Sequence, residues 1–291
     1  MKILIIGADG QIGSSLLRSC SSFNELRVAG TSINRTENTY FLDITRETNV
    51  HEVFSQFKPD AAILCSALTN VDECEKNKDL AHAINIGGTE STAAACRKTG
   101  TKLVFLSTDY VFDGKAGPYS ETDAPNPLNF YGHTKLAGEK IAGNIENSLI
   151  IRSCMVYSYA PSSLNYAMQV LTRLRNNTPV TAYNDQFENP TYAPELSDTI
   201  IKMILGQKRG IYHVAGSDWT TRHEFARQVA VVFGFHNPDI RPVSTAADTN
   251  KASRPLKAGL KNSKLFSETG ISLSGHIAGV EKMKIACDKN I

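Results

Sequence analysis

The sequence lacks several features that would indicate particular classes of protein. No apolar run approaches the roughly 18 residues of a membrane-spanning helix. The start, MKILIIGADGQIG, has too short an apolar stretch before its glycines to be a signal peptide. The six cysteines and seven histidines show no Cys-x-x-Cys or paired-histidine spacing, so we expect no metal site. The expectation that follows is a cytoplasmic protein with reduced thiols.

An excess of charge of one sign is also missing. Lys and Arg number 31 against 29 Asp and Glu, which gives a formal net charge of +2. This balance implies no strong electrostatic field, so the composition does not indicate binding to nucleic acid or to an anionic membrane, and we expect neither as a partner. The sequence leaves both a monomer and a homodimer open.

What the first half does contain is an alternation of buried-strand and helix patterns. Continuous apolar runs at residues 2–6, 61–67 and 102–107 are typical of strands buried on both faces. The order predicts an α/β fold with a doubly wound parallel sheet of the Rossmann type, and the less regular second half predicts a smaller substrate-binding lobe. The predicted division is a dinucleotide-binding domain of residues 1–152 plus roughly 193–216, and a lobe of residues 153–192 and 217–291.

A glycine-rich turn, GADGQIG, follows the first predicted strand and opens a helix. That context is the one a dinucleotide fingerprint requires. Glycines permit a tight turn and let backbone amides approach a pyrophosphate, while the helix N-terminus adds partial positive charge. We therefore predict cofactor contacts from Gly7, Gly10, Gln11, Ile12 and Gly13.

The end of the second predicted strand, AGTSINR, carries no acidic residue to bind the ribose 2′-hydroxyl of NAD. Ser32 and Arg35 suit a 2′-phosphate instead, so the predicted cofactor is NADPH, with NADH as the alternative. Asp43, after the third predicted strand, either accepts a hydrogen bond from the adenine amino group or caps a helix. Ile44, beside it, is included among the predicted cofactor contacts.

Three residues are predicted to carry the chemistry. Thr108 ends the fifth predicted strand, and open α/β sheets bind ligands at the carboxyl ends of their strands. Tyr131 and Lys135, in FYGHTK, lie one turn apart on a predicted helix. Lys135 would lower the phenol pKa from its usual value of about 10, so that Tyr131 protonates a carbonyl that receives hydride from nicotinamide.

These motifs resemble the extended short-chain dehydrogenase/reductase superfamily and, more narrowly, the dTDP-4-dehydrorhamnose reductase family. The resemblance is carried by GADGQIG, CSALTNVDECE, INIGGT, STDYVFDG, PYSETDAPNPLNFYGHTKLAGE, NDQFENPTYAPELSD and SRPLKAGLKNSKL, in the family's order from residue 7 to residue 265. It implies NAD(P)H-dependent reduction of a 4-keto group on a nucleotide-activated 6-deoxysugar. It also implies that Thr108, Tyr131 and Lys135 are the catalytic trio, which bind substrate or cofactor as well, and that Cys65, Ser66 and Ala67 line the cofactor cleft.

The chain departs from the family pattern in the implied substrate site. Met155 stands where the rhamnose-forming reductases commonly carry tryptophan, and a thioether packs on a sugar without offering a stacking plane. Lys257 stands where asparagine is expected, and either a phosphate contact or a solvent-facing side chain would explain it. Arg254, before a proline, suits a diphosphate that it can bind bidentately. The predicted substrate contacts are Thr108, Met155, Gln186, Thr191 and Arg254, and the sugar and base stay open.

Three other functions share this fold. Sugar-nucleotide 4,6-dehydratases carry Thr-Asp-Glu, whereas here Thr108 and Asp109 are followed by Tyr110, which removes the expected base. Epimerases share the trio, although the missing acidic residue after the second strand disfavours them. The regulatory β subunit of methionine adenosyltransferase is also similar to this family. Such a subunit would form a stoichiometric complex with another enzyme and turn over no keto-sugar.

Overall fold

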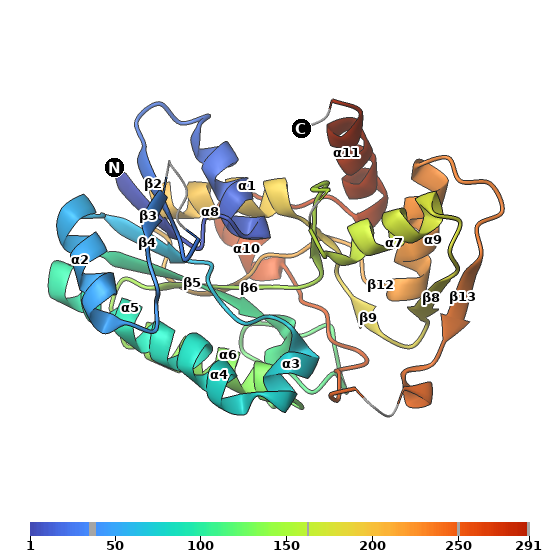
Figure 1. Ribbon diagram of the computed structural model, residues 1–291, viewed down its shortest axis with the longest axis horizontal. Coiled ribbons are helices and arrows are strands. Elements are labelled where there is room, and N and C mark those ends of the chain that lie inside the picture. Colours follow the sequence, from blue (N-terminus) through green and yellow to red (C-terminus); the bar gives the residue numbers. More distant parts are fainter. Residues whose placement is uncertain (35–38, 162, 249–250, 290–291) are drawn as a thin grey trace.

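The computed structural model describes residues 1–34, 39–161, 163–248 and 251–289. In this part of the chain seven parallel strands form one sheet, in the order β11-β6-β5-β4-β1-β2-β3 (Figure 1). The predicted doubly wound α/β fold is confirmed. The strands are β1 (Lys2–Ile6), β2 (Arg27–Ser32), β3 (Thr39–Phe41), β4 (Ala61–Leu64), β5 (Lys102–Thr108), β6 (Leu149–Ser153) and β11 (Gly210–His213).

The central strands are apolar on both faces because helices cover both faces. Ile3 and Ile5 of β1 pack in one core cluster, and Leu4 and Ile6 pack in the other, all four fully buried. One cluster lies under α1 (Gln11–Cys20) and α8 (Ala193–Leu205). The opposite cluster lies under α2 (Glu47–Phe57), α5 (Gly88–Thr99) and α6 (Phe130–Gly143) (Figure 1).

The helical region between β4 and β5 is interrupted rather than continuous. It consists of α3 (Val71–Lys76), α4 (Lys78–His82), a single π-helical turn η1 (Ala83–Gly87), and α5. Asn85 lies in the π turn, where π geometry often marks a functional position. Its side chain accepts a hydrogen bond from Leu68 N at 2.8 Å and donates to Thr134 Oγ1 at 3.0 Å. The π turn therefore joins the loop after β4 to helix α6.

The smaller lobe has a core of its own, in which residues such as Leu171 and Phe225 are fully buried. Its position beside the sheet is seen in Figure 1. The predicted domain division stays a prediction, and Leu265 and Leu273 of the predicted lobe pack with the core cluster of the sheet. The remaining elements are α7 (Tyr166–Arg175), α9 (Arg222–Val232), α10 (Ser263–Thr269), α11 (His276–Asp288), β7 (Val156–Tyr157), β8 (Val180–Tyr183), β9 (Phe187–Glu188), β10 (Thr191–Tyr192), β12 (Thr220–Thr221), β13 (Ile240–Val243), and the short 3-10 turns η2 (Asp109–Val111) and η3 (Thr245–Ala247).

Membrane-spanning helices are not found in the described ranges, since none of the helices there combines enough length with enough apolar character.

Helix α6 packs tightly on β5 at Gly138, where an added Cβ would lie 2.4 Å from Phe105 Cζ. We expect Gly138→Ala to lower the free energy of unfolding by about 1–3 kcal/mol, because an extra methyl group forces packed neighbours apart. The measurement is the midpoint of urea unfolding at unchanged m value. Gly143→Ala on the same helix is the matched control, since among the described residues nothing outside the adjacent helix backbone lies within 4 Å of its added Cβ. The control should gain up to about 1 kcal/mol, and equal stability of the two variants would contradict the close packing.

Candidate active site

Thr108, Tyr131 and Lys135 meet at the carboxyl end of β5. Thr108 is the last residue of this strand, and α6, which carries the other two, packs along it. The hydroxyl of Thr108 interacts with the phenol of Tyr131. It also caps the turn that follows, because Tyr110 N donates to Thr108 Oγ1 at 3.2 Å. The structure thus brings the three residues predicted from the sequence into one site.

The N-terminus of α6 is fixed by contacts on three sides. Asn129 is the N-cap, and its Oδ1 accepts from Gly132 N at 2.8 Å. Phe130 N donates to Glu75 Oε2 of α3 at 2.9 Å. Only glycine fits at position 132, since a Cβ there would lie 2.2 Å from Tyr110 O. The backbone around Tyr131 is therefore held on both sides of this residue.

Burial sets the charge state of this site. Lys135 is 5% exposed, and its Nζ lies 4.2 Å from the centroid of the Phe105 ring. Burial lowers the pKa of Lys135 to about 8, although the Glu139 carboxylate opposes the shift. Burial also raises the pKa of the Tyr131 phenol, while the Thr108 hydroxyl opposes this. Lys135 is not among the groups that shift the phenol pKa here, so the expectation that it lowers this pKa stays a prediction.

A cavity of about 510 Å³ lies where β1, β2 and β4 end. Its lining contains the predicted cofactor contacts Gly7, Gly10, Asp43, Ile44, Cys65, Ser66 and Ala67. Cys65 is also close enough to Lys135 for their charges to interact, so Lys135 lies near the wall of this cavity. Burial raises the pKa of the Cys65 thiol to about 12, so this cysteine is an inert part of the wall.

The shape of this cavity fits a dinucleotide. Gly7 has φ +84°, and a Cβ there would lie 2.5 Å from Ser66 Oγ. A Cβ on Gly13 would lie 2.1 Å from Gly7 O. Helix α1 begins after Gly10 with no side-chain cap, so its first N–H groups are open to an anion. The glycines therefore let this turn pack closely on Ser66 and on its own backbone, which gives the tight turn that a pyrophosphate site needs.

The other predicted cofactor residues have different surroundings. Gln11 Nε2 donates to Val156 O at 3.1 Å, which ties α1 to β7. Ile12 packs against the core of the sheet. Ser32 is buried at the end of β2, where its Oγ donates to Asp9 Oδ2 at 2.7 Å. Arg35 lies outside the described residues.

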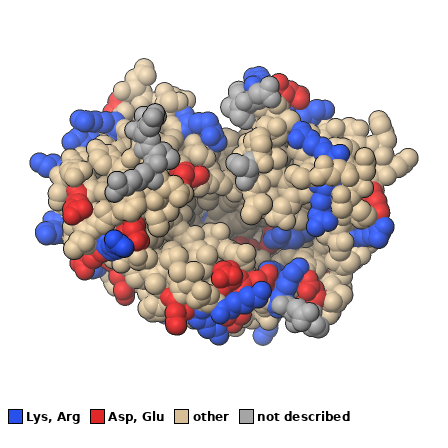
Figure 2. Space-filling view, in the orientation of Figure 1, with Lys and Arg blue, Asp and Glu red and all other residues tan. Residues whose placement is uncertain are grey.

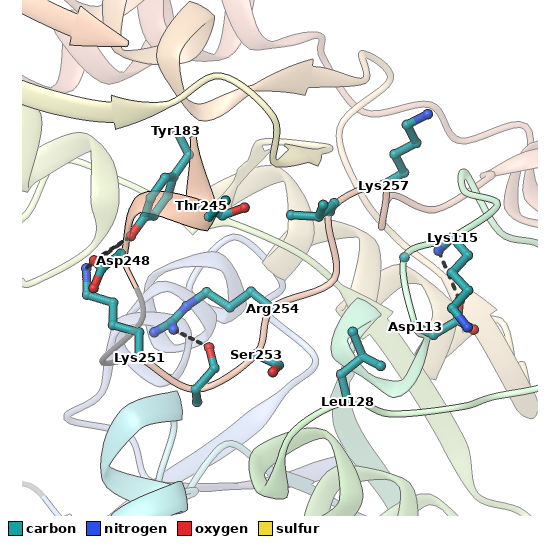
Figure 3. Close-up of a pocket in the computed structure, with 14 residues that line it drawn as sticks. Asp113, Lys115, Leu128, Tyr183, Thr245, Asp248, Lys251, Ser253, Arg254 and Lys257 are labelled. Carbon is teal, nitrogen blue, oxygen red and sulfur yellow. Dashed lines mark hydrogen bonds and ion pairs between the residues drawn. The ribbon is translucent and has the colours of Figure 1, made fainter. Parts of the chain in front are cut away.

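A second set of cavities lies between the sheet and the smaller lobe, where the face in Figure 2 is hollowed. One, of about 660 Å³, is lined by Asp72 on one side and by Gln186 and Arg222 on the other. The next, of about 760 Å³, has Arg254 and Lys257 on one segment of its wall, with Lys115 across from them (Figure 3). Arg254 lines both.

Arg254 is held by an ion pair between the two parts of the molecule. Its Nη2 lies 2.9 Å from Asp72 Oδ2, and Nη1 donates to Ala252 O at 2.8 Å. Ala252 N in turn donates to Asp72 Oδ1 at 3.0 Å. No local pattern in the sequence points to Asp72, because its partner is 182 residues away.

The remaining predicted substrate residues, Gln186, Met155 and Thr191, differ in their surroundings. Gln186 lines the cavity of about 660 Å³, and its Nε2 donates to Tyr110 Oη at 3.3 Å. Met155 has φ +39°, a strained conformation for a side chain of this size, and such strain is often found at functional sites. Thr191 is fully buried, and its hydroxyl donates to Asn189 O at 2.9 Å and accepts from Gly216 N at 3.2 Å. The structure brings Gln186 and Arg254 to the cleft, and engages Thr191 in internal bonds.

Sequence reasoning missed a buried charged cluster directly beyond Thr108. Asp109 and Glu188 are each 1% exposed, and Arg222 Nη2 lies 3.1 Å from Glu188 Oε2. Burial raises the pKa of Asp109 well above its usual range, and the Glu188 carboxylate adds to this rise. Thr108 Oγ1 donates to Asp109 Oδ1 at 3.1 Å, so the cluster adjoins the three predicted catalytic residues. In the sequence, the acidic residue Asp109 in STDYVFDG was the one feature that pointed to this cluster.

A search of the residues with described positions finds no group of three or more His, Cys, Asp or Glu side chains that could hold a metal ion.

Comparisons with known proteins agree along nearly the whole chain. The family model described as "RmlD substrate binding domain" matches residues 1–286. The spore coat polysaccharide biosynthesis protein SpsK of Bacillus subtilis (strain 168) is 33% identical over 93% of this chain and 92% of its own. The dTDP-4-dehydrorhamnose reductase of Salmonella typhimurium (strain LT2) is 32% identical over 97% of both chains.

Two further comparisons bear on function. A crystal structure of dTDP-4-dehydrorhamnose reductase from Bacillus anthracis in complex with NADP superposes with a TM-score of 0.90, at 30% identity and over 98% of both chains. The methionine adenosyltransferase 2 subunit beta of Xenopus tropicalis is 28% identical over 91% of this chain and 81% of its own.

The lowered pKa of Lys135 predicts a pH-dependent term in stability. Between pH 8 and pH 10.5 the unfolded chain holds this proton and the folded chain does not, so folding becomes more favourable as pH rises. This gain in the free energy of unfolding is complete above pH 10.5 and is lost as the pH falls from 10.5 to below 8. We expect the free energy of unfolding of the wild type, minus that of Lys135→Met, to increase across this window in urea titrations without cofactor. Lys140→Met, at an exposed position of the same helix, is the matched control, and a flat difference for Lys135→Met would contradict the assignment.

Proposed function

Since this chain belongs to the RmlD substrate binding domain family, we propose that it is an NADPH-dependent oxidoreductase that reduces a nucleotide-diphospho-4-keto-6-deoxysugar. The membership agrees with the family resemblance read from the sequence motifs. Relatives that are 32% and 31% identical to this chain are named dTDP-4-dehydrorhamnose reductase, and one related structure holds NADP. Action in the cytoplasm, as a monomer or a homodimer, stays a prediction.

The observation that carries this proposal is the position of the trio between two kinds of cavity. On one side, Lys135 adjoins Cys65 in the wall of the glycine-lined cavity. On the other side, the Tyr131 ring lies edge-on to Tyr110 at 5.9 Å between centroids, and Tyr110 bonds Gln186 in the cleft. A cofactor in the first cavity and a sugar in the cleft would then lie on opposite sides of the trio.

Each residue of the trio has a distinct part in the reaction. A bound NADPH supplies the hydride. The phenol of Tyr131, kept neutral by burial, holds the proton that the ketone oxygen needs. To orient that oxygen, Thr108 turns its hydroxyl proton away from Asp109 Oδ1, which lies 3.1 Å from Thr108 Oγ1. Lys135, with a pKa of about 8, is mainly an ammonium ion at pH 7, so it stabilises the phenolate left on Tyr131.

The cleft supplies cations for a diphosphate. Lys115, Lys251, Arg254 and Lys257 all line the cavity of about 760 Å³. The guanidinium of Arg254 already binds a carboxylate, Asp72, with a geometry that also suits a phosphate. Exchange of Asp72 for a phosphate oxygen would keep this charge paired when substrate binds.

A second function is favoured by one observation. The similarity to a methionine adenosyltransferase β subunit spans most of the chain, so a regulatory protein that binds nucleotide is the alternative. Stable complex formation with a second enzyme, together with no turnover of any keto-sugar, would support it over the reductase.

Tyr131→Phe tests the proton donor. We expect kcat to fall by about 10²–10⁴, the range that general acids contribute. The dissociation constant of NADPH should stay nearly unchanged, because only the hydroxyl is lost. The measurement is NADPH oxidation with enzymatically prepared dTDP-4-keto-6-deoxysugar and with its 3,5-epimer.

Tyr40→Phe serves as the control for loss of one tyrosine hydroxyl, because Tyr40 contacts Phe57 at the end of α2. Undiminished turnover in Tyr131→Phe would remove this residue from the mechanism. NADPH binding without turnover of any keto-sugar by the wild type would favour the regulatory alternative.

Arg254→Gln tests the diphosphate site. We expect KM for the sugar nucleotide to rise by about tenfold to a hundredfold, as loss of a charge-assisted hydrogen bond implies, with a smaller change in kcat. The dissociation constant of NADPH should not change. Arg241→Gln is the control, since Arg241 is exposed on β13 and pairs with Asp239. An unchanged KM in Arg254→Gln would place the diphosphate elsewhere.

A further inference from the structure

One carboxylate of the glycine-lined cavity has no part in the function described so far. Asp9 lies in the glycine-rich turn and lines the cavity with Gly7, Gly10 and Ile33. Its Oδ2 accepts hydrogen bonds from Ser32 Oγ at 2.7 Å and from Asn34 Nδ2 at 3.2 Å. The turn is thereby joined to the end of β2, and it brings a negative charge to that place.

The hydroxyl of Ser32 is already fully used. Ser32 is 1% exposed, its Oγ donates to Asp9, and the same oxygen accepts from Asn34 N at 2.9 Å. A hydroxyl has one proton to donate. While Asp9 holds that proton, Ser32 cannot donate to a 2′-phosphate as the sequence had suggested.

The end of β2 is where a dinucleotide fold meets the 2′ position of the adenosine ribose. A carboxylate there accepts hydrogen bonds from ribose hydroxyls, whereas a phosphate brings up to about two negative charges toward it. Asp43 adds a second carboxylate to the same cavity, although Arg46 Nε lies 3.4 Å from its Oδ2, and no Lys, Arg or His stands among the described residues that line the cavity. Asp9 has no such cation beside it among the described residues that line the cavity, so its charge favours a ribose diol over a phosphate.

We infer that Asp9 is a specificity-determining residue, whose carboxylate accepts hydrogen bonds from the ribose diol of NADH and opposes the 2′-phosphate of NADPH. The missing acidic residue after β2 is supplied by the glycine-rich turn instead. Asp9 thereby lowers the preference for NADPH over NADH. This inference rests on the proposed function, because it requires a nicotinamide cofactor in this cavity.

Asp9→Asn removes the charge and keeps an oxygen that can accept from Ser32. We expect the dissociation constant of NADPH to fall and that of NADH to rise, which shifts their ratio by about tenfold toward NADPH, as one unit charge facing a phosphate in a partly wet site implies. Isothermal titration of the full chain with each cofactor, without sugar, measures both constants. The shift should shrink at about 1 M salt, a dependence that a purely structural contact would not show.

Two variants accompany this measurement. Glu25→Gln makes the same change in net charge at an exposed residue beside the N-terminus, at the far end of β1, and should leave the ratio unchanged. Asp9→Ala removes the charge and also the bond from Ser32, so compared with Asp9→Asn it should weaken both cofactors equally and keep the shifted ratio.

The possible outcomes distinguish the role of Asp9 from the proposed function. An unchanged ratio in Asp9→Asn, with turnover of keto-sugar by the wild type, would overturn the role of Asp9 and leave the proposed function standing. A ratio that moves equally at low and high salt would also overturn it. Failure of the wild type to bind either cofactor would overturn both.

Discussion

The buried ion pair between Glu139 and Arg152 is the constraint on which the site depends. Arg152 Nε and Nη2 donate to the two carboxylate oxygens at 2.8 and 2.7 Å, and Ser107 Oγ donates to Glu139 Oε1 at 2.5 Å. A buried pair is tolerated only when geometry and extra hydrogen bonds offset desolvation, as they do here. Ser107 precedes Thr108, and Glu139 lies one turn beyond Lys135. The pair thus fixes α6 in register with β5 and β6.

Burial, more than pairing, sets the proton distribution around that helix. It lowers the pKa of Lys135 and raises the pKa values of Tyr131 and Asp109, so all three groups are shifted toward their neutral forms. Tyr131 thereby keeps its proton at neutral pH, whereas Lys135, with a pKa of about 8, still carries its charge there.

The parts of the site that could be predicted from the sequence are those with a local signal. The glycines after β1 and the Tyr131–Lys135 spacing on one helix are read within a few residues, and the structure brings them to cavities. Asp72 pairs with a residue 182 positions away, and Asp9 pairs with one 23 positions away, so no local pattern reveals either contact. Ser32 was read as a free donor because a sequence shows which groups exist, and not which partner each has already bonded.

The sheet is completed by segments from the second half of the chain. Strand β11 forms one edge beside β6, and α8 packs against α1, while Leu265 of α10 joins the same core cluster. During synthesis from the N-terminus, the first 153 residues can therefore form six strands with one helical face, but they leave the other face largely uncovered until residue 205 has left the ribosome. The nascent chain must carry exposed apolar surface through that interval, and the cleft closes only when Arg254, near the end of the chain, reaches Asp72.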